Sequence, residues 1–395
     1  MPMANETRLP KQQTSAAAQL MGTPVRRNSK FLVISRHDYR SRRKANVHFI
    51  ARELAQHGTT RFFSSAFSLL SHLTQDQRLP LWSRANSVEH LDGVETYLWR
   101  TLAHPCRAPR LLHGAMDRYF RSYVERAPAT LRAWIADSDM VLLESGGPEI
   151  FFDLVRRHNP TCRIGYIGSD SLETIGSARY VAAELQRVAP LFDAVYLPSK
   201  LLAPAFPPGC RLRFVPHGVD AGMLQASGAS PYKGKVNLVS VGNMLFDPGF
   251  FEAAAPAFPD VNFHVIGGGK GARKLAAPNI AVYPETSFKD TLPYLKHADA
   301  GVAPYAGSKA PAYLRHTSMK LMQYGHLGLP AICPAALAGE CRGRFGYVPG
   351  NPGSIAEAVR GALSLGRMDG LDFLSWAEVT QRIVAPEDFP DTALS

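Results

Sequence analysis

The chain has 395 residues, of which 46% are hydrophobic and 19% charged, so it is globular and too long for one ordinary core. Its net charge is +11, and residues 1–60 alone hold eleven Lys/Arg against three Asp/Glu. This asymmetry suggests an anionic partner, namely a nucleic acid, an anionic membrane surface or a phosphorylated substrate.

Residues 1–28 are polar, rich in Ala, Gln and Thr, and lack the apolar core of a signal peptide, so we expect a disordered leader there. No apolar run approaches the length of a transmembrane helix. The five cysteines are scattered and form no C-x-x-C pair, which favours neither a zinc site nor a disulfide framework. A reducing cytoplasm is the expected compartment.

Short apolar runs typical of buried parallel strands alternate with helical patterns in the first half. The first run, residues 30–35, leads into a basic loop at 36–44, and a helix is expected from Asn46 until Gly58. The loop is either a solvated surface or an anion-facing segment, because it leaves the carboxyl edge of a strand. Further strands are expected at 61–64, 140–143, 163–167, 194–198 and 213–217.

Residues 62–135 are rich in aromatic residues and arginine. Arg107, Arg110, Arg118 and Arg121 are interleaved with the apolar side chains of residues 111–123. This pattern fits an interfacial membrane contact, but the more common origin of such a pattern is a core-facing amphipathic helix with a solvated face.

Two groups of acidic residues lie near strand ends. Asp137 and Asp139 form a D-x-D triplet, which binds a metal in one class of sugar-nucleotide enzymes, but here it precedes its strand and we reject it as a metal site. Asp170 follows the strand at 163–167, where a general base would stand. A helix-capping role for Asp170 fits the local sequence as well.

The stretch at residues 299–330 is the most informative part of the second half. It predicts a strand at 300–304, a polar loop, and a helix capped by Ser318 with Lys320 and Gln323 on one face. A helix N-terminus at the carboxyl end of a parallel strand binds anions. An ordinary βαβ unit with a surface lysine would show the same pattern.

The remaining elements of the second half repeat the alternation of strand and helix. A Gly-rich turn at 267–271 misses the P-loop spacing but leaves amides for a phosphate. The whole pattern predicts an α/β protein with two Rossmann-like, doubly wound domains facing each other across a cleft. Its expected limits are an N-terminal domain at 29–220, a linker at 221–235, a C-terminal domain at 236–370, and a C-terminal helix and tail at 371–395 packing back on the N-terminal domain.

Five segments in this order and spacing resemble the GT-B glycosyltransferases. They are V-P-H-G-V-D at 215–220, V-S-V-G-N at 239–243, V-I-G-G-G at 265–269, H-A-D-A-G-V-A-P at 297–304 and K-L-M-Q-Y-G-H-L-G-L-P at 320–330. The whole chain resembles more closely a narrower family, the membrane-associated glucuronosyltransferases that use UDP-glucuronate in xanthan-type exopolysaccharide assembly.

The resemblance implies an inverting, metal-independent enzyme that needs no cofactor. It would transfer β-glucuronate from UDP-glucuronate to a mannose hydroxyl of a polyprenyl-diphosphate-linked oligosaccharide. The N-terminal domain would bind the acceptor and an anionic membrane surface, and the C-terminal domain would bind the nucleotide sugar. The protein would be peripheral, on the cytoplasmic face of the inner membrane, with no nucleic-acid partner.

Carried over position by position, the resemblance assigns Asp170 as general base. It places seven residues around UDP: Met244, Glu285, Tyr305, Ser318, Met319, Lys320 and Gln323. Gln323 stands where related enzymes usually have a Glu that binds the ribose. The loop after the first C-terminal strand holds no cation, so Lys320 and the helix dipole must neutralise the diphosphate, with Lys270 and Arg315 as further candidates.

Two alternatives remain at this stage. A GT-B transferase with a different sugar nucleotide would share most of these motifs. A basic nucleic-acid-binding protein would share the high isoelectric point, near 9.5, although the chain shows no RNP-like, KH or helix-turn-helix signature.

Overall fold

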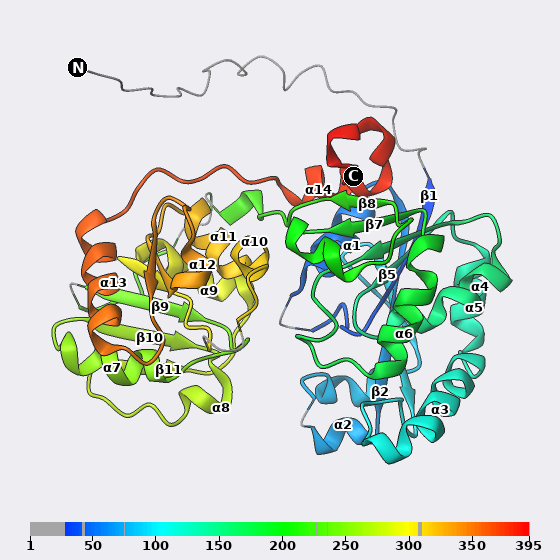
Figure 1. Cartoon of the computed structure of the whole chain (residues 1–395), viewed down its shortest axis with the longest axis horizontal. Coiled ribbons are helices and arrows are strands. Elements are labelled where there is room, and N and C mark those ends of the chain that lie inside the picture. Colours follow the sequence, from blue (N-terminus) through cyan, green and yellow to red (C-terminus); the bar gives the residue numbers. More distant parts are fainter. Residues whose placement is uncertain are drawn as a thin grey trace.

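The computed structural model describes residues 28–394 except 42, 43, 75, 224, 226, 227, 235 and 307–309. Residues 1–27 of the proposed leader therefore lie outside the described residues. Four residues of the proposed linker, 224, 226, 227 and 235, also lie outside them. The described chain forms two lobes side by side, each built around a sheet with helices on its faces (Figure 1). This α/β architecture confirms the expected pair of doubly wound domains.

The N-terminal lobe is organised around an eight-stranded sheet in the order β3-β4-β2-β1-β5-β6-β7-β8. Neighbouring strands are parallel, except that β3 and β4 are antiparallel. The central strands are continuous apolar runs because both faces of a parallel sheet are covered. The strand bounds are β1 Ser29–Ser35, β2 Gly58–Ser68, β3 Val88–Leu91, β4 Val94–Thr101, β5 Met140–Glu144, β6 Arg163–Ile167, β7 Ala194–Leu197 and β8 Leu212–Phe214.

The chain enters this sheet at β1, moves to β2 and β4 on one side, and then crosses to β5 on the other side of β1. The loops that leave β1 and β5 therefore diverge and open a crevice at the carboxyl edge. The helices of this lobe are α1 Asn46–Leu54, α2 Leu70–Leu73, α3 His113–Glu125, α4 Ala129–Ala136, α5 Phe152–His158 and α6 Arg179–Val188.

The C-terminal lobe contains a six-stranded parallel sheet in the order β11-β10-β9-β12-β13-β14. Its order reverses between β9 and β12, which opens a second crevice of the same kind. Its strands are β9 Asn237–Val241, β10 Asn262–Ile266, β11 Ile280–Tyr283, β12 Ala300–Val302, β13 Ala331–Pro334 and β14 Arg344–Tyr347. Its helices are α7 Gly249–Ala257, α8 Gly269–Ala272, α9 Phe288–His297, α10 Leu314–Thr317, α11 Met319–His326, α12 Ala335–Ala338 and α13 Pro352–Leu365.

The last helix, α14 (Trp376–Val384), lies on the N-terminal lobe, after an extended segment that runs back from α13 along one side of the molecule (Figure 1). The ring of Trp376 is almost fully buried and stacks on Phe49 of α1, with the centroids 5.0 Å apart. The hydroxyl of Tyr196 in β7 donates a hydrogen bond to the carbonyl of Ile383 at 2.7 Å. These contacts support assigning the C-terminal segment to the N-terminal domain.

Two expectations about local structure need correction. Gly58 does not close the first helix, because α1 ends at Leu54 and Gly58 begins β2, which extends to Ser68 and so exceeds the expected 61–64. A Cβ at Gly58 would lie 1.9 Å from the carbonyl oxygen of Ser29, so the close approach of β1 and β2 requires glycine there. Strands β3 and β4 were not expected, and the sequence of β3, V-E-H-L, is mostly exposed and lacks an apolar face.

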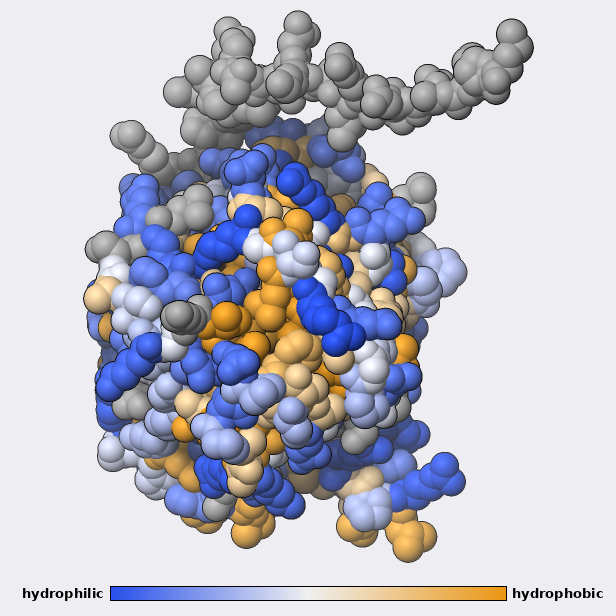
Figure 2. Space-filling model, turned by 90° about the vertical axis from the view of Figure 1, so that its left-hand side faces the viewer, coloured by the Kyte–Doolittle hydropathy of each residue, from blue (hydrophilic) through white to orange (hydrophobic). Residues whose placement is uncertain are grey.

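The outer surfaces of the two lobes differ. Figure 2 shows the side of the C-terminal lobe that is turned away from the N-terminal lobe, where one apolar patch is surrounded by hydrophilic residues. Among the described residues, the most exposed leucines belong to the N-terminal lobe: Leu73, Leu102 and Leu111 are 82%, 83% and 99% exposed. No helix in the described part of the chain combines the length and the apolar character needed to cross a membrane.

Candidate active site

The crevices of the two sheets meet in one cleft of about 530 Å³ between the lobes. Its walls come from the loops at the carboxyl ends of β1, β5 and β6 in one lobe and of β9, β10 and β12 in the other. The proposed base and all seven residues that the resemblance places around UDP line this cleft: Asp170, Met244, Glu285, Tyr305, Ser318, Met319, Lys320 and Gln323. The tertiary structure thus gathers residues from both halves of the chain.

Helix α11 presents its N-terminus to the cleft. Ser318 caps the helix, because its Oγ accepts a hydrogen bond from the amide of Leu321, as expected. The hydroxyl of Tyr305 lies 2.6 Å from the same Oγ, and the Nζ of Lys320 lies 4.9 Å from the centre of the Tyr305 ring. An ammonium group and the positive end of a helix dipole therefore meet at one point, which suits a diphosphate.

The position of α11 is set by its packing on the sheet. Tyr324 is fully buried, and its hydroxyl donates to the carbonyl of Val302 in β12 at 3.2 Å. The ring of Tyr324 lies over Gly301, where a Cβ would come within 2.7 Å of it. Any larger residue at Gly301 would push α11, and with it Lys320, away from the cleft.

The other candidate nucleotide ligands surround this point. Met244 follows β9 and is 39% exposed, while Glu285 follows β11 and is also exposed. Gln323 lies partly buried on α11, where its amide can bond a sugar hydroxyl. The loop after β9 is held in place because the amide of Ala306 donates to the carbonyl of Leu245 at 2.8 Å.

Neither of the two additional cations considered for the diphosphate lines the cleft. Lys270 lies at a separate hollow of about 260 Å³ beside the Gly-rich turn. Arg315 turns toward α12, where its guanidinium donates to the carbonyl of Ala336 at 2.9 Å. Lys270 belongs to α8 and Arg315 to α10, and sequence spacing did not reveal where these short helices lie relative to the cleft.

Asp170 leaves β6 and is partly buried in the N-terminal wall of the cleft. Its amide donates to Ser145 Oγ at 3.3 Å, and its Oδ1 accepts from the hydroxyl of Tyr313 at 3.3 Å. The helix-capping alternative is wrong, because the next helix, α6, begins after Ala178. Burial raises the pKa of Asp170, and the charge of Arg36 and the Tyr313 hydrogen bond lower it in part. A carboxylate with a raised pKa is a better proton acceptor near neutral pH.

Sequence analysis missed two charged neighbours of Asp170. Glu144, the last residue of β5, is buried, and its pKa is raised to about 7, mainly by burial. Ser35 donates a hydrogen bond to Glu144. The buried Nε of Arg36 has no hydrogen-bond partner among the described residues. Glu144 could not be recognised from the sequence because it directly follows the apolar residues of β5. Arg36 could not be singled out because the loop at 36–44 contains several cations.

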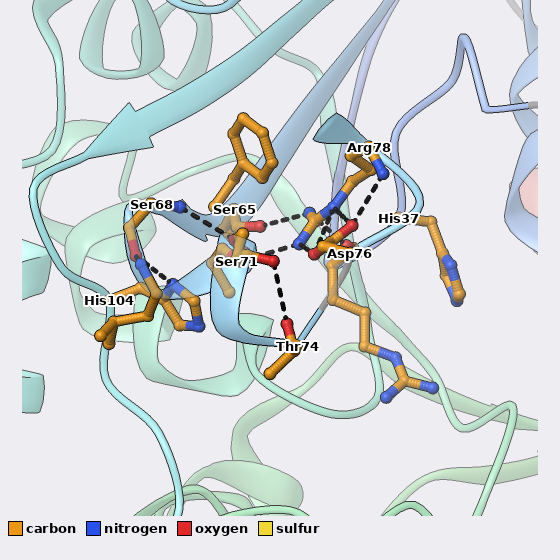
Figure 3. A network of polar contacts seen from close by, with 12 residues as sticks. His37, Ser65, Ser68, Ser71, Thr74, Asp76, Arg78 and His104 are labelled. Atoms are coloured by element: carbon orange, nitrogen blue, oxygen red, sulfur yellow. Dashed lines mark hydrogen bonds and ion pairs between the residues drawn. The ribbon is translucent and has the colours of Figure 1, made fainter. Parts of the chain in front are cut away.

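A buried arginine fixes the loop that carries Arg36. Arg78 donates to the carbonyl of Arg36 at 2.7 Å and to that of Ser65 at 2.9 Å, and it pairs with Asp76 at 2.8 Å. Figure 3 shows this network around Arg78, with His37 pointing away from it. His37 lines the cleft, so the network sets the backbone position of two cleft residues.

The described residues contain no group of three or more His, Cys, Asp or Glu side chains arranged to hold a metal ion. The rejected D-x-D triplet is used structurally. Asp137 pairs with Arg61 at 2.9 Å and also with Lys30, and Asp139 accepts from the Lys30 amide at 2.8 Å. These ion pairs tie the start of β5 to the start of β1.

Comparison with known proteins extends what the cleft shows. Residues 33–198 match the model of a family described as "Glucuronosyltransferase GumK, N-terminal domain". A UDP-glucuronate:glycolipid 2-beta-glucuronosyltransferase from Xanthomonas campestris pv. campestris is 44% identical over 365 residues, which cover 92% of this chain and 91% of that protein. The chain belongs to the GumK glucuronosyltransferase family. It is a glycosyltransferase, as the sequence resemblance indicated.

Solved structures agree on the architecture of this glucuronosyltransferase family member. An alpha,alpha-trehalose-phosphate synthase (UDP-forming) from Burkholderia vietnamiensis superposes with a TM-score of 0.56 at 13% identity, over 92% of this chain and 96% of that chain. The Anabaena protein HepE, solved with UDP and glucose, gives a TM-score of 0.52 at 12% identity, over 91% of this chain and 95% of that chain. At such low identity these matches show the fold, which is GT-B.

Proposed function

We propose that this protein transfers glucuronate from UDP-glucuronate to a mannose hydroxyl of a polyprenyl-diphosphate-linked oligosaccharide, with inversion and without a metal. The observation that carries the proposal is the shared cleft, because Asp170 from one lobe and Lys320 with Gln323 from the other line the same space. The Xanthomonas relative is named for UDP-glucuronate, a glycolipid and a β-linkage, which supports the same chemistry here.

In this reaction Asp170 accepts the proton of the attacking hydroxyl. The hydroxyl oxygen forms a bond to the anomeric carbon of glucuronate while the bond from that carbon to the diphosphate oxygen breaks. UDP leaves with the electron pair, and a single displacement inverts the anomeric carbon. The raised pKa of Asp170 supports its role as the proton acceptor.

The charge that develops on the leaving UDP is met by Lys320 and the N-terminus of α11. Gln323 lies on the same helix, one turn beyond the Ser318 cap, where it would bond the ribose. Met244 and Glu285 would flank the nucleotide from the loops after β9 and β11. Metal independence is an expectation of this arrangement, because the cation and the dipole supply positive charge at the leaving group.

A transfer assay with the full-length protein tests the donor. We expect UDP-glucuronate, and not UDP-glucose, to add one sugar to a mannose-terminated polyprenyl-diphosphate oligosaccharide, with the product read by mass spectrometry. EDTA should leave the rate unchanged. Equal use of UDP-glucose would favour a transferase with another donor, and loss of transfer in EDTA would overturn the metal-free mechanism.

The acceptor is lipid-linked, so the protein must approach a membrane. Leu73 at the end of α2 is largely exposed, as are Leu102 and Leu111 after β4. Arg107 and Arg110 lie exposed between these last two leucines. The loop after β4 is tied to the end of β2, because Ser68 Oγ and His104 Nδ1 are 2.8 Å apart. Exposed leucines beside arginines are typical of an interfacial contact with anionic lipid. We propose peripheral binding to the cytoplasmic face of the inner membrane through this surface.

Replacing Leu102 and Leu111 together with Ser is expected to weaken binding to vesicles that contain anionic lipid by about tenfold or more. Each buried leucine side chain contributes roughly 1.5–3 kcal/mol, so even partial insertion accounts for this loss. Vesicle co-sedimentation measures it. The control is Leu365→Ser, an exposed leucine on α13 of the other lobe, which should bind normally. Equal loss in both proteins would refute this surface.

A further inference from the structure

Tyr313 belongs to the C-terminal lobe but contacts the proposed base in the N-terminal lobe. Its hydroxyl donates to Asp170 Oδ1 at 3.3 Å and accepts from the amide of Ser171 at 3.4 Å. The side chain is 4% exposed and packs in the core cluster that both lobes share. The hydrogen bond therefore joins the two lobes, and the tyrosine that donates it is held in place by the core.

The short helix that follows Tyr313 is a contact element between the lobes. His316 Nδ1 lies 3.0 Å from Ser199 Oγ, and the carbonyl of Thr317 lies 3.2 Å from His217 Nδ1. Ser199 and His217 both belong to the N-terminal lobe, so α10 contacts that lobe through its last two residues.

The same segment continues directly into the nucleotide-binding helix. Ser318 ends α10 and caps α11, and Lys320 lies in the first turn of α11. Only six residues separate Tyr313 from Lys320. The group that would bind UDP and the group that holds the base are therefore parts of one continuous structural unit.

We propose that Tyr313 is a positioning residue that aligns the carboxylate of Asp170 for proton transfer when α10 is seated against the N-terminal lobe. This inference rests on the proposed role of Asp170 as the base. The hydrogen bond occupies Oδ1 and leaves Oδ2 for the acceptor hydroxyl. Burial, followed by the charge of Asp170, raises the pKa of Tyr313 to about 12, so its hydroxyl stays a donor at working pH.

Other groups also act on Asp170 and must be separated from Tyr313 in a test. Arg36 in the loop after β1 lowers the pKa of Asp170. Burial raises the pKa of Glu144 at the end of β5 and of Tyr305 after β12, and the charge of Asp170 adds a smaller contribution in the same direction to each. A Tyr313→Phe substitution leaves all three in place.

The test is the pH profile of the full-length Tyr313→Phe protein with UDP-glucuronate and a mannose-terminated lipid-linked acceptor. Phe keeps the ring in the core but cannot donate, so we expect kcat to fall about tenfold. The acidic limb of the profile should move to higher pH, because the bond that stabilises the charged carboxylate is lost. The KM for UDP-glucuronate should not change. An unchanged limb together with an unchanged kcat would overturn the inference.

Three comparisons sharpen the result. Tyr232→Phe removes a hydroxyl that donates to the carbonyl of Tyr294 in the same lobe, and it should keep the wild-type profile. In an Asp170→Asn background, Tyr313→Phe should cause no further loss, because both act on one step. In a Glu144→Gln background, Tyr313→Phe should still move the acidic limb of the pH profile to higher pH. If it does not, the acidic limb reports the titration of Glu144, and the role of Tyr313 is refuted.

The outcomes also separate this inference from the proposed function. If Asp170→Asn keeps normal turnover, the base assignment fails, and the role of Tyr313 fails with it. If Asp170→Asn is inactive while Tyr313→Phe behaves as wild type, only the positioning role is refuted.

Discussion

Replacing Asp170 with Asn is expected to lower turnover by about 10²–10⁴-fold while UDP affinity stays nearly unchanged. Asn keeps the size of the side chain and an oxygen that can accept the Tyr313 hydrogen bond, but it cannot take the proton of the acceptor. Turnover is measured with saturating UDP-glucuronate, and UDP affinity by calorimetry. Because the nucleotide would be bound from the opposite wall of the cleft, the two measurements should separate cleanly.

The matched control for this variant is Asp153→Asn in the same lobe. Asp153 is exposed and pairs with Arg187 at 2.7 Å, outside the cleft, so its loss should leave turnover unchanged. Normal turnover in Asp170→Asn would disprove the assignment of Asp170 as the base. The candidate would then be Glu144, the other carboxylate beside Arg36 in the same wall.

Replacing Lys320 with Ala is expected to weaken UDP binding by about 10–100-fold. The substitution removes the ammonium group at the N-terminus of α11, and a hydrogen bond to a charged partner contributes roughly 1.5–3 kcal/mol. Titration calorimetry with UDP measures the loss directly. Affinity for uridine, which lacks the diphosphate, should change little.

Lys270→Ala provides the control for Lys320→Ala. The two lysines belong to the same lobe, but Lys270 lies at a separate hollow and should leave UDP affinity unchanged. If Lys270→Ala weakened UDP binding as much as Lys320→Ala, a general electrostatic attraction would explain the data better than a contact at α11.

The GT-B fold could be predicted from the chain because its elements are local. Buried parallel strands read as short apolar runs, although β12 ends at Val302, two residues before the end of the expected strand at 300–304. The cap at Ser318 and the positions of Lys320 and Gln323 on α11 follow from helix periodicity alone. Helix periodicity had already placed these residues on one helix, and the resemblance to glucuronosyltransferases then assigned them to UDP binding.

Features that depend on distant contacts could not be read in the same way. Gly58 looked like a helix end, and only the close approach of β1 to β2 showed why glycine stands there. Lys270 and Arg315 were further candidates beside Lys320 as partners for a diphosphate. The directions of their side chains, set by tertiary packing, excluded both from the cleft.

The sequence by itself determined many of the strands and helices, the cap of α11, and the place of a carboxylate in the loop after β6, because hydrophobic periodicity and capping act over a few residues. Only the tertiary structure decided the surroundings of that carboxylate. Arg36, Glu144 and Tyr313 come from three distant segments and meet at Asp170 because the switch points of two sheets face each other. Burial and the contacts between the lobes set the surroundings of the proposed base, and neither can be recognised from a pattern in the sequence.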